Sequence, residues 1–221
     1  MILSLISVLL LLSAIRTKAS KQSDEIKILP GWNKTLPSKQ YSGYLTTGSG
    51  DRHLHYWFVE SENSPENSPL VVWFNGGPGC SSLDGFFYEH GPFIPSDDGS
   101  TLLLRETRWS SLANMLYIEA PAGVGFSYSD SKSYTFNDDT TAEDNFNAIQ
   151  DFFAMYPEYL THKFYLTGES YAGIYVPTLA YTILKHTDAG TYTGAPLIGI
   201  AVGNGCTGTE VGICGLYQKD V

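Results

Sequence analysis

Short apolar runs separated by helix-type patterns constrain the fold of this chain more than any other feature. Residues 70–74 form a continuous apolar run bounded by turn signals, which is typical of a strand buried on both faces. Comparable runs predict further strands at 53–59, 114–118, 164–167 and 196–202. Several buried strands in one chain require covering elements between them.

Helical patterns do occur between the predicted strands. Thr140 and Glu143 form a capping box, and Pro157 ends the helix that follows it. The apolar residues of this segment are spaced as one helical stripe, at Ala142, Phe146, Ile149 and Phe153. A second helix is predicted over 172–185. Strands alternating with helices predict an α/β fold, with a mostly parallel sheet, helices on both faces and functional residues at the carboxyl ends of strands.

Composition excludes several classes of protein. The chain contains 22 glycines and 11 prolines, which is near ordinary usage and excludes a collagen-like or disordered chain. The chain has 13 Lys and Arg residues and 23 Asp and Glu residues, which gives a formal net charge of -10. A chain this acidic repels phosphate backbones, so nucleic acid is not an expected partner.

The first residues have the pattern of a secretory signal. An apolar run at 2–12 is too short to span a bilayer comfortably, and small residues suited to cleavage follow it at Ala14 and Ala19. We predict a signal peptide at 1–19, a domain over 20–221 and no membrane span after cleavage; a membrane anchor or a buried strand is the alternative. The glycosylation sequon that begins at Asn33 fits a secreted protein or one delivered to an acidic vesicle.

One strand-to-helix junction carries a candidate nucleophile. Ser170 lies in Gly-Glu-Ser-Tyr-Ala, which matches the nucleophile elbow except that Ala172 stands where the general pattern has Gly. Such a sharp turn holds the hydroxyl clear of the backbone, and the first helical N–H groups face the developing oxyanion. The pattern alone is equally compatible with an ordinary Gly-Ser turn in which Ser170 caps the helix.

A second, Gly-rich junction follows the predicted strand at 70–74. The segment 75–82, Asn-Gly-Gly-Pro-Gly-Cys-Ser-Ser, occupies the position where hydrolases with an elbow place a second oxyanion N–H. A phosphate cradle is the alternative, but no Gly-Lys-Ser/Thr follows and Rossmann spacing is absent. The two junctions together are more specific than either one alone.

Five sequence blocks occur in a fixed order, at 73–82 (WFNGGPGCSS), 86–92 (FFYEHGP), 119–128 (EAPAGVGFSY), 168–173 (GESYAG) and 201–205 (AVGNG). With these blocks the chain resembles the serine carboxypeptidase family, whose members include lysosomal and vacuolar enzymes. The resemblance extends from about residue 41 to about residue 205. It implies an α/β-hydrolase fold and a secreted, lysosomal or vacuolar location.

The resemblance also implies roles for individual residues. Ser170 matches the nucleophile, and the N–H groups of Gly77 and Tyr171 match the oxyanion hole. The residues that match the site for the free C-terminal carboxylate of the substrate are Asn75, Glu89 and Glu169. The implied activity is release of C-terminal amino acids from peptides and proteins through an acyl-enzyme, without a cofactor or metal.

Two carboxylates beside a substrate carboxylate would repel it if all three were ionised. Burial and like-charge coupling should raise the pKa of the Glu89/Glu169 pair, so that it carries at least one proton below neutral pH. A protonated carboxyl group then donates a hydrogen bond to the substrate, as the Asn75 amide can. Peptidase activity is therefore predicted to favour acidic pH.

Other polar residues are interpreted as structural. The acidic pairs 138–139 and 143–144 are expected to favour a helix N-terminus rather than to bind a metal, because acidic side chains are stabilised there. His53 and His55 alternate on a predicted strand and are interpreted as surface residues with satisfied hydrogen bonds.

The catalytic base is the part of the family pattern that this sequence lacks. The triad of this fold follows the order Ser, Asp, His, and the one histidine after Ser170 is His186, which follows the nucleophile helix too closely. We expect both triad partners, the last strands and the cap insertion beyond Val221. The chain is therefore interpreted as an N-terminal portion of a carboxypeptidase that is inactive alone.

The cysteine count is odd, with Cys80, Cys206 and Cys214. An oxidising compartment normally pairs its thiols, so one partner is missing. The resemblance implies that Cys80 pairs with a cysteine far downstream, and Cys206 could pair locally with Cys214.

Two other functions stay open from the sequence. One is a secreted, non-catalytic protein that binds peptide C-termini, and the other is an acyltransferase like those related to the family in plants. The presence of Asn75, Glu89 and Glu169 favours the peptidase over the acyltransferase, because all three are suited to a free carboxylate.

Overall fold

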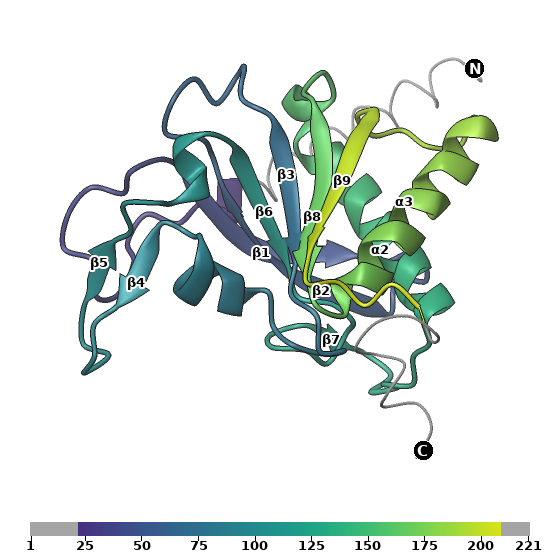
Figure 1. Cartoon of the computed structure of the whole chain (residues 1–221), viewed down its shortest axis with the longest axis horizontal. Helices are drawn as coiled ribbons and strands as arrows, with labels where there is room; N and C mark the ends of the chain where they lie inside the picture. Colours follow the sequence, from purple (N-terminus) through teal and green to yellow (C-terminus); the bar gives the residue numbers. More distant parts are fainter. Residues whose placement is uncertain (1–21, 209–221) are drawn as a thin grey trace, which may run out of the picture.

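A computed structural model describes residues 22–208, so the predicted signal peptide and Cys214 lie outside the described residues. A seven-stranded sheet in the order β1-β2-β6-β3-β8-β9, with β7 beside β2, forms the centre (Figure 1). Its strands are β1 (Gln40–Thr46), β2 (Arg52–Val59), β3 (Leu70–Phe74), β6 (Asn114–Ile118), β7 (Tyr128–Ser129), β8 (Phe164–Glu169) and β9 (Leu197–Gly203). Pairing is parallel from β6 through β3 and β8 to β9 and antiparallel among β1, β2, β6 and β7.

All five predicted strands are present. The apolar runs at 70–74 and 114–118 became β3 and β6 with unchanged bounds, whereas β8 extends two residues past the predicted end, to Glu169. The pattern missed β1, whose polar residues and Gly43 dilute the apolar signal at the edge of the sheet. It also missed the short β7 and the separate hairpin of β4 (Phe93–Pro95) and β5 (Leu102–Leu104).

The two predicted helices are α2 (Asp138–Met155) and α3 (Ala172–Asp188). The predicted capping box at Thr140 is wrong by three residues, because Asn137 is the N-cap. Its side chain accepts from the Thr140 N–H at 2.8 Å, and the Thr140 hydroxyl accepts from the Asn137 N–H at 3.0 Å. The earlier start places Asp138 and Asp139 in the first turn, where the helix dipole favours acidic side chains.

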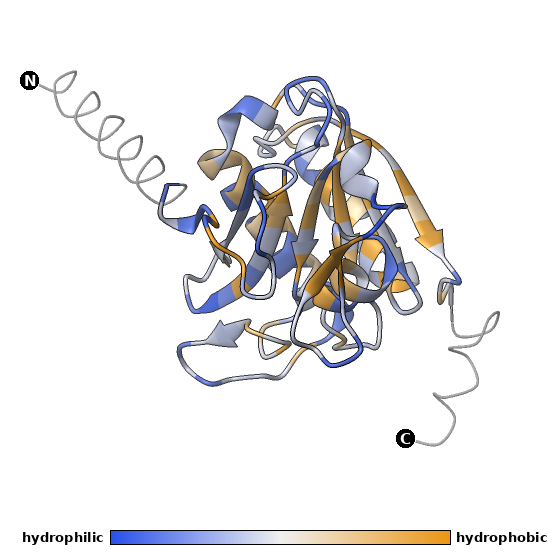
Figure 2. Ribbon diagram, turned by 90° about the vertical axis from the view of Figure 1, so that its left-hand side faces the viewer, coloured by the Kyte–Doolittle hydropathy of each residue, from blue (hydrophilic) through white to orange (hydrophobic). Residues whose placement is uncertain are grey.

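Alternating side chains of the central strands face two different cores. On β3, Val72 and Phe74 belong to the larger core, which includes residues of α2 and α3, whereas Trp73 belongs to a smaller core on the opposite face. That second face is covered by a π-helical turn, η1 (Gly85–Glu89), and by residues near Trp32. Figure 1 shows α2 and α3 together on one side of the sheet, and Figure 2 shows hydrophobic stretches gathered on the strands.

A membrane span requires a helix of sufficient length and hydrophobicity, and none of the helices within 22–208 meets both requirements.

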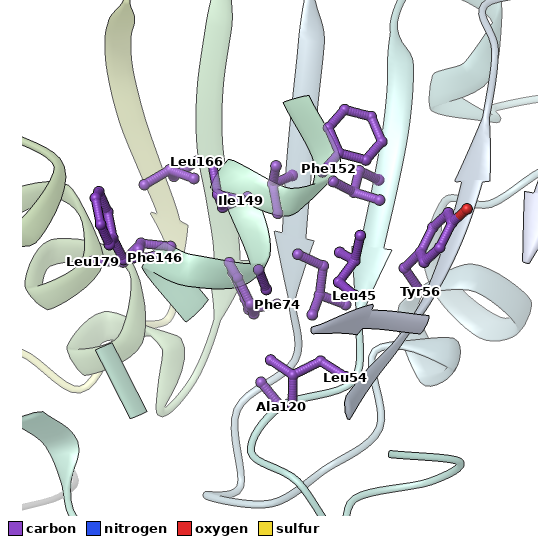
Figure 3. Close-up of a cluster of buried hydrophobic side chains, with 14 of the residues drawn as sticks. Leu45, Leu54, Tyr56, Phe74, Ala120, Phe146, Ile149, Phe152, Leu166 and Leu179 are labelled. Carbon is purple, nitrogen blue, oxygen red and sulfur yellow. The ribbon is translucent and has the colours of Figure 1, made fainter. Parts of the chain in front are cut away.

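Phe152 belongs to the larger core, where aromatic rings from β2 and the end of α2 pack against it; Figure 3 labels it among other residues of this core. It is fully buried and its ring lies 5.1 Å from that of Phe58 and 4.7 Å from that of Tyr156, measured between centroids. We expect Phe152→Ala to lower the free energy of unfolding by about 3–5 kcal/mol, because it removes apolar contacts and leaves a cavity. Urea denaturation measures this, and the control is Tyr181→Ala, which removes an exposed aromatic ring from α3 and should cost less than about 1 kcal/mol. Equal losses in the two variants would contradict the assignment of the core.

Candidate active site

Ser170 stands on a sharp turn between β8 and α3. Its φ is 58°, in the left-handed region that few residues other than glycine adopt, and α3 begins two residues later at Ala172. The turn is held from β9 and the segment after it, because the Ser170 N–H donates to the Gly203 carbonyl at 3.0 Å and its carbonyl accepts from the Cys206 N–H at 2.8 Å. Tyr171 is the N-cap and makes no side-chain capping bond, so the alternative in which Ser170 caps the helix is wrong.

Small residues let the Gly-rich loop 75–82 approach this turn closely. A Cβ atom added at Gly168 would lie 2.5 Å from the Phe74 carbonyl oxygen and 2.6 Å from the Ala172 Cβ. A Cβ atom added at Gly76 would collide with the Tyr171 backbone nitrogen. The loop and the nucleophile turn therefore contact each other through backbone atoms, which explains the small residues that the elbow pattern requires.

The two N–H groups predicted to form the oxyanion hole are free to donate. Within 22–208, neither the Gly77 nor the Tyr171 N–H donates to a backbone or side-chain acceptor. The loop around them is held by the Cys80 N–H, which donates to the Gly76 carbonyl at 3.0 Å, and by the Gly79 N–H, which donates to the Tyr175 hydroxyl at 3.2 Å. Free N–H groups in a fixed loop beside a helix start are suited to stabilising an oxyanion.

Asn75, Glu89 and Glu169, here called the acid–amide cluster, lie together although they come from three elements. The Asn75 side-chain amide donates to Glu89 Oε1 at 2.8 Å and to Glu169 Oε1 at 3.2 Å. Its own oxygen accepts from the Trp73 indole at 2.8 Å and from the Gly85 N–H at 3.0 Å. Asn75 thus bridges the two carboxyl groups, and both of its N–H atoms are engaged. The second oxygen of each carboxyl group makes no hydrogen bond within 22–208 and can bind a ligand.

The carboxyl group of Glu89 is partly buried although much of the residue is exposed. Burial raises the pKa of Glu89, and the neighbouring carboxyl groups of Glu169 and Asp84 raise it further. The Asn75 hydrogen bond and the Arg105 charge oppose this shift without cancelling it. For Glu89, the direction agrees with the expectation that burial and a neighbouring carboxyl group raise the pKa.

No histidine lies against the candidate nucleophile. All five histidines of the chain are within 22–208, and each ring contacts a different group: Asp130 for His53, Glu119 for His55, Tyr117 for His90, the Ser68 carbonyl for His162 and Thr191 for His186. The Ser170 hydroxyl makes no hydrogen bond within the same residues. The described residues therefore bring together a candidate nucleophile, two candidate N–H donors and an acid–amide cluster, and none of their histidines is hydrogen-bonded to Ser170.

Sequence reasoning missed a buried network centred on Glu119, which is 1% exposed. Its carboxylate accepts from the Phe126 N–H at 2.9 Å and from the Ser81 hydroxyl in the Gly-rich loop. His55 Nδ1 lies 2.9 Å from the same carboxylate, and its Nε2 lies 2.8 Å from the Ser42 hydroxyl. The interpretation of His55 as a surface residue is wrong, because the residue is buried and the Phe126 ring packs against its ring, with centroids 5.2 Å apart. Burial alone would raise the pKa of Glu119, but these hydrogen bonds outweigh it and lower the pKa.

Two of the cysteines fall within the described residues. Cys80 is a free, exposed thiol at the edge of the Gly-rich loop, and Cys206 is disulfide-bonded. Of the acidic residues expected at a helix N-terminus, Asp138 and Asp139 do lie in the first turn of α2, and Asp138 accepts a hydrogen bond from the Tyr171 hydroxyl at 3.0 Å. The expectation is wrong for 143–144, which lie in the second turn, where Asp144 pairs with Arg52 at 2.6 Å.

Comparison with known proteins gives a consistent result. A model of the serine carboxypeptidase family matches residues 30–218. Lysosomal protective protein of Mus musculus is 54% identical over 209 residues, which are 94% of this chain and 43% of that protein. Serine carboxypeptidase 1 of Hordeum vulgare is 46% identical over 198 residues, covering 86% of this chain and 40% of that protein. The chain spans about two fifths of the length of these curated relatives.

Among solved structures, the prohormone-processing carboxypeptidase Kex1(Δ)p of Saccharomyces cerevisiae matches with a TM-score of 0.76 and 30% identity. The match covers 85% of this chain and 44% of that one. The fold is thus the predicted α/β-hydrolase fold. Because the family model matches most of the residues and curated members are 46% and 54% identical, the chain belongs to the serine carboxypeptidase family.

Proposed function

We propose that the protein is a serine-type carboxypeptidase that releases single C-terminal amino acids from peptides at acidic pH. One observation carries this proposal: two residues of the acid–amide cluster lie next to the candidate catalytic groups in the chain. Glu169 immediately precedes Ser170, and Asn75 lies two residues before Gly77. A carboxylate bound by the cluster would therefore lie close to the peptide bond that Ser170 attacks, which limits cleavage to the last residue.

The reaction follows from these positions. The Ser170 oxygen bonds to the carbonyl carbon of the last peptide bond, while the Gly77 and Tyr171 N–H groups stabilise the negative charge on the carbonyl oxygen. The C–N bond then breaks, the serine proton passes through a base to the leaving amine, and a free amino acid departs. Water hydrolyses the serine ester and regenerates the hydroxyl group.

The base is assigned to sequence outside this chain. Two points support this assignment: each of the five histidines here contacts another group, and in the family pattern the triad aspartate and histidine follow the nucleophile helix. The 221-residue chain by itself is accordingly proposed to be inactive.

Peptidase activity should fall as pH rises through the raised pKa of Glu89. The protonated carboxyl group donates to the substrate carboxylate, and its ionised form repels that carboxylate. The measurement is kcat/KM against pH, in the full-length gene product, for a blocked dipeptide with a free C-terminus and for a blocked amino-acid ester. The fall attributed to Glu89 should occur with the dipeptide and be absent with the ester.

Glu89→Gln serves as the matched variant for this prediction, because its amide stays neutral and can donate at every pH. This variant should weaken the fall in kcat/KM at high pH for the dipeptide and leave the pH dependence of kcat/KM for the ester unchanged. Identical pH profiles for the two substrates in the unmodified enzyme would remove the assigned role of the acid–amide cluster.

A location in the secretory pathway, as a secreted, lysosomal or vacuolar protein, is proposed from three observations. Residues 1–19 have the pattern of a signal peptide, Asn33 in its sequon is exposed, and the mouse relative is named a lysosomal protein. Mass spectrometry of the protein from its native source tests this proposal: a glycan on Asn33 supports it, and an unmodified Asn33 with an intact N-terminus contradicts it.

The alternative functions differ in their products. An acyltransferase would convert an ester and an alcohol to a new ester, and a non-catalytic binder would retain a peptide without cleaving it. Incubation with a blocked dipeptide and analysis by mass spectrometry separates the three, since the carboxypeptidase alone releases a free amino acid. The paired carboxyl groups at Asn75 favour the peptidase, because they are suited to a substrate with a free carboxylate.

A further inference from the structure

Arg105 lies against the helical turn that carries Glu89. Its guanidinium donates to the Phe87 carbonyl at 2.7 Å, to the Gly91 carbonyl at 3.1 Å and to the Phe93 carbonyl at 3.4 Å. Its own N–H donates to the Pro92 carbonyl at 2.9 Å. Within 22–208 it forms no ion pair with a carboxylate. This partly buried cation therefore makes its contacts with backbone oxygens of one segment.

Two of these carbonyls flank Glu89, one two residues before it and one two residues after it. The turn η1 is π-helical, and it ends where the His90 N–H donates to the Gly85 carbonyl at 3.0 Å. Carbonyl groups at the end of such a turn have no following helical N–H to pair with. The planar guanidinium supplies the missing donors in a fixed geometry, which a single ammonium group could not reproduce.

Glu89 needs such support because its partners come from other parts of the chain. Asn75 follows β3, and Glu169 ends β8. The first residue of η1 is tied to Asn75, because the Gly85 N–H donates to the Asn75 side-chain oxygen at 3.0 Å, but Glu89 stands at the other end of this five-residue turn. Arg105 joins this end of the turn to the base of the β4–β5 hairpin, because its guanidinium donates to the Phe87 and Phe93 carbonyls.

We propose that Arg105 is a positioning residue for the binding of a free C-terminal carboxylate. Its guanidinium bonds to the Phe87 and Gly91 carbonyls and thereby holds Glu89 beside Asn75 and Glu169. This inference rests on the proposed function and extends it to a residue outside the family's sequence blocks. Arg105 also supplies the positive charge that acts on Glu89, against the acidic groups of Asp84 and Glu169.

The test compares Arg105→Gln and Arg105→Lys in the full-length gene product. Two substrates are used, a blocked dipeptide and the same dipeptide with an amidated C-terminus, so that the same bond is cleaved in both. Arg105→Gln should raise KM for the free acid about 10- to 100-fold, which is the effect of losing one charged hydrogen bond. KM for the amide should change less than about threefold. The control is Arg52→Gln, which breaks the ion pair of Arg52 with Asp144. It should leave the ratio of KM for the free acid to KM for the amide unchanged.

The pH profile separates the charge of Arg105 from its geometry. Loss of the cation in Arg105→Gln should move the alkaline fall to higher pH, because the ionised form of Glu89 loses its one favourable charge. Arg105→Lys retains a charge but not the planar guanidinium with its several donors, so it should keep the pH profile and still raise KM.

The other ionisable groups near Glu89 are Glu169, Asp84, Tyr117 and His90. Burial, assisted by the Arg105 charge, lowers the pKa of His90 to about 4.

A binding measurement keeps this proposal independent of turnover. In a Ser170→Ala background, calorimetry with the free-acid and amidated dipeptides should give a preference for the acid that Arg105→Gln abolishes. If the enzyme cleaves neither substrate, the proposed function fails while the calorimetric comparison still decides the role of Arg105. An unchanged acid-to-amide preference in both Arg105 variants would overturn the proposal, including when their melting temperatures fall. If Arg105→Gln does not fold, Arg105→Lys provides the deciding comparison.

Discussion

Ser170→Ala should lower kcat for a blocked dipeptide by about 10⁶-fold in the full-length gene product, because the attacking oxygen is lost. The substitution keeps the Cβ atom, so the backbone at φ 58° experiences the same strain in both proteins. Folding and peptide binding should therefore be retained. Release of the C-terminal amino acid, followed by chromatography, measures the loss.

The control for this variant is Ser133→Ala, which alters an exposed serine without a hydrogen bond within the described residues. It should retain full activity. Turnover in Ser170→Ala equal to that of Ser133→Ala would remove the catalytic assignment altogether. Retained binding without turnover in the unmodified protein would instead favour the non-catalytic binder of peptide C-termini.

Residues 20–221 expressed alone should hydrolyse blocked dipeptides no faster than their own Ser170→Ala variant. A serine hydroxyl is a weak nucleophile unless a base takes its proton, and the five histidines are held elsewhere. The one histidine after the nucleophile, His186, lies about 21 Å along α3 from its start, at 1.5 Å per helical residue. It is stacked on Phe146, with ring centroids 4.1 Å apart.

A fluorophosphonate probe gives a second readout for the same chain. It should label Ser170 in the full-length gene product and leave residues 20–221 unlabelled at equal concentration, since labelling requires an activated serine. A folded monomer of residues 20–221 that cleaves the dipeptide, and loses this activity in Ser170→Ala, would contradict the prediction. His186→Ala would then identify whether that histidine is the base.

Local patterns in the sequence were sufficient for five strands of the central sheet and for the two long helices. Apolar runs such as 70–74 and 114–118 coincide with β3 and β6 because a strand buried on both faces leaves no place for polar residues. The N-cap of α2 was misplaced because Asn137 and Thr140 are both capping residues, and local sequence does not choose between them. The π-helical turn had no signature at all, since its hydrogen bonds depend on packing against Trp73 and Tyr117.

The sequence by itself determined the family, the α/β fold and the residues that carry the candidate chemistry, because each of these resides in short blocks of consecutive residues. Only the tertiary structure decided which of those residues meet. Asn75 and Glu169 are 94 positions apart, His55 and Glu119 are 64 apart, and Arg105 reaches the Phe87 carbonyl across 18. Such contacts depend on the order of strands in the sheet and on the path of the loops, so no local pattern encodes them. The bridging role of Asn75, the burial of His55 and the support of Glu89 by Arg105 were for that reason visible only in the folded chain.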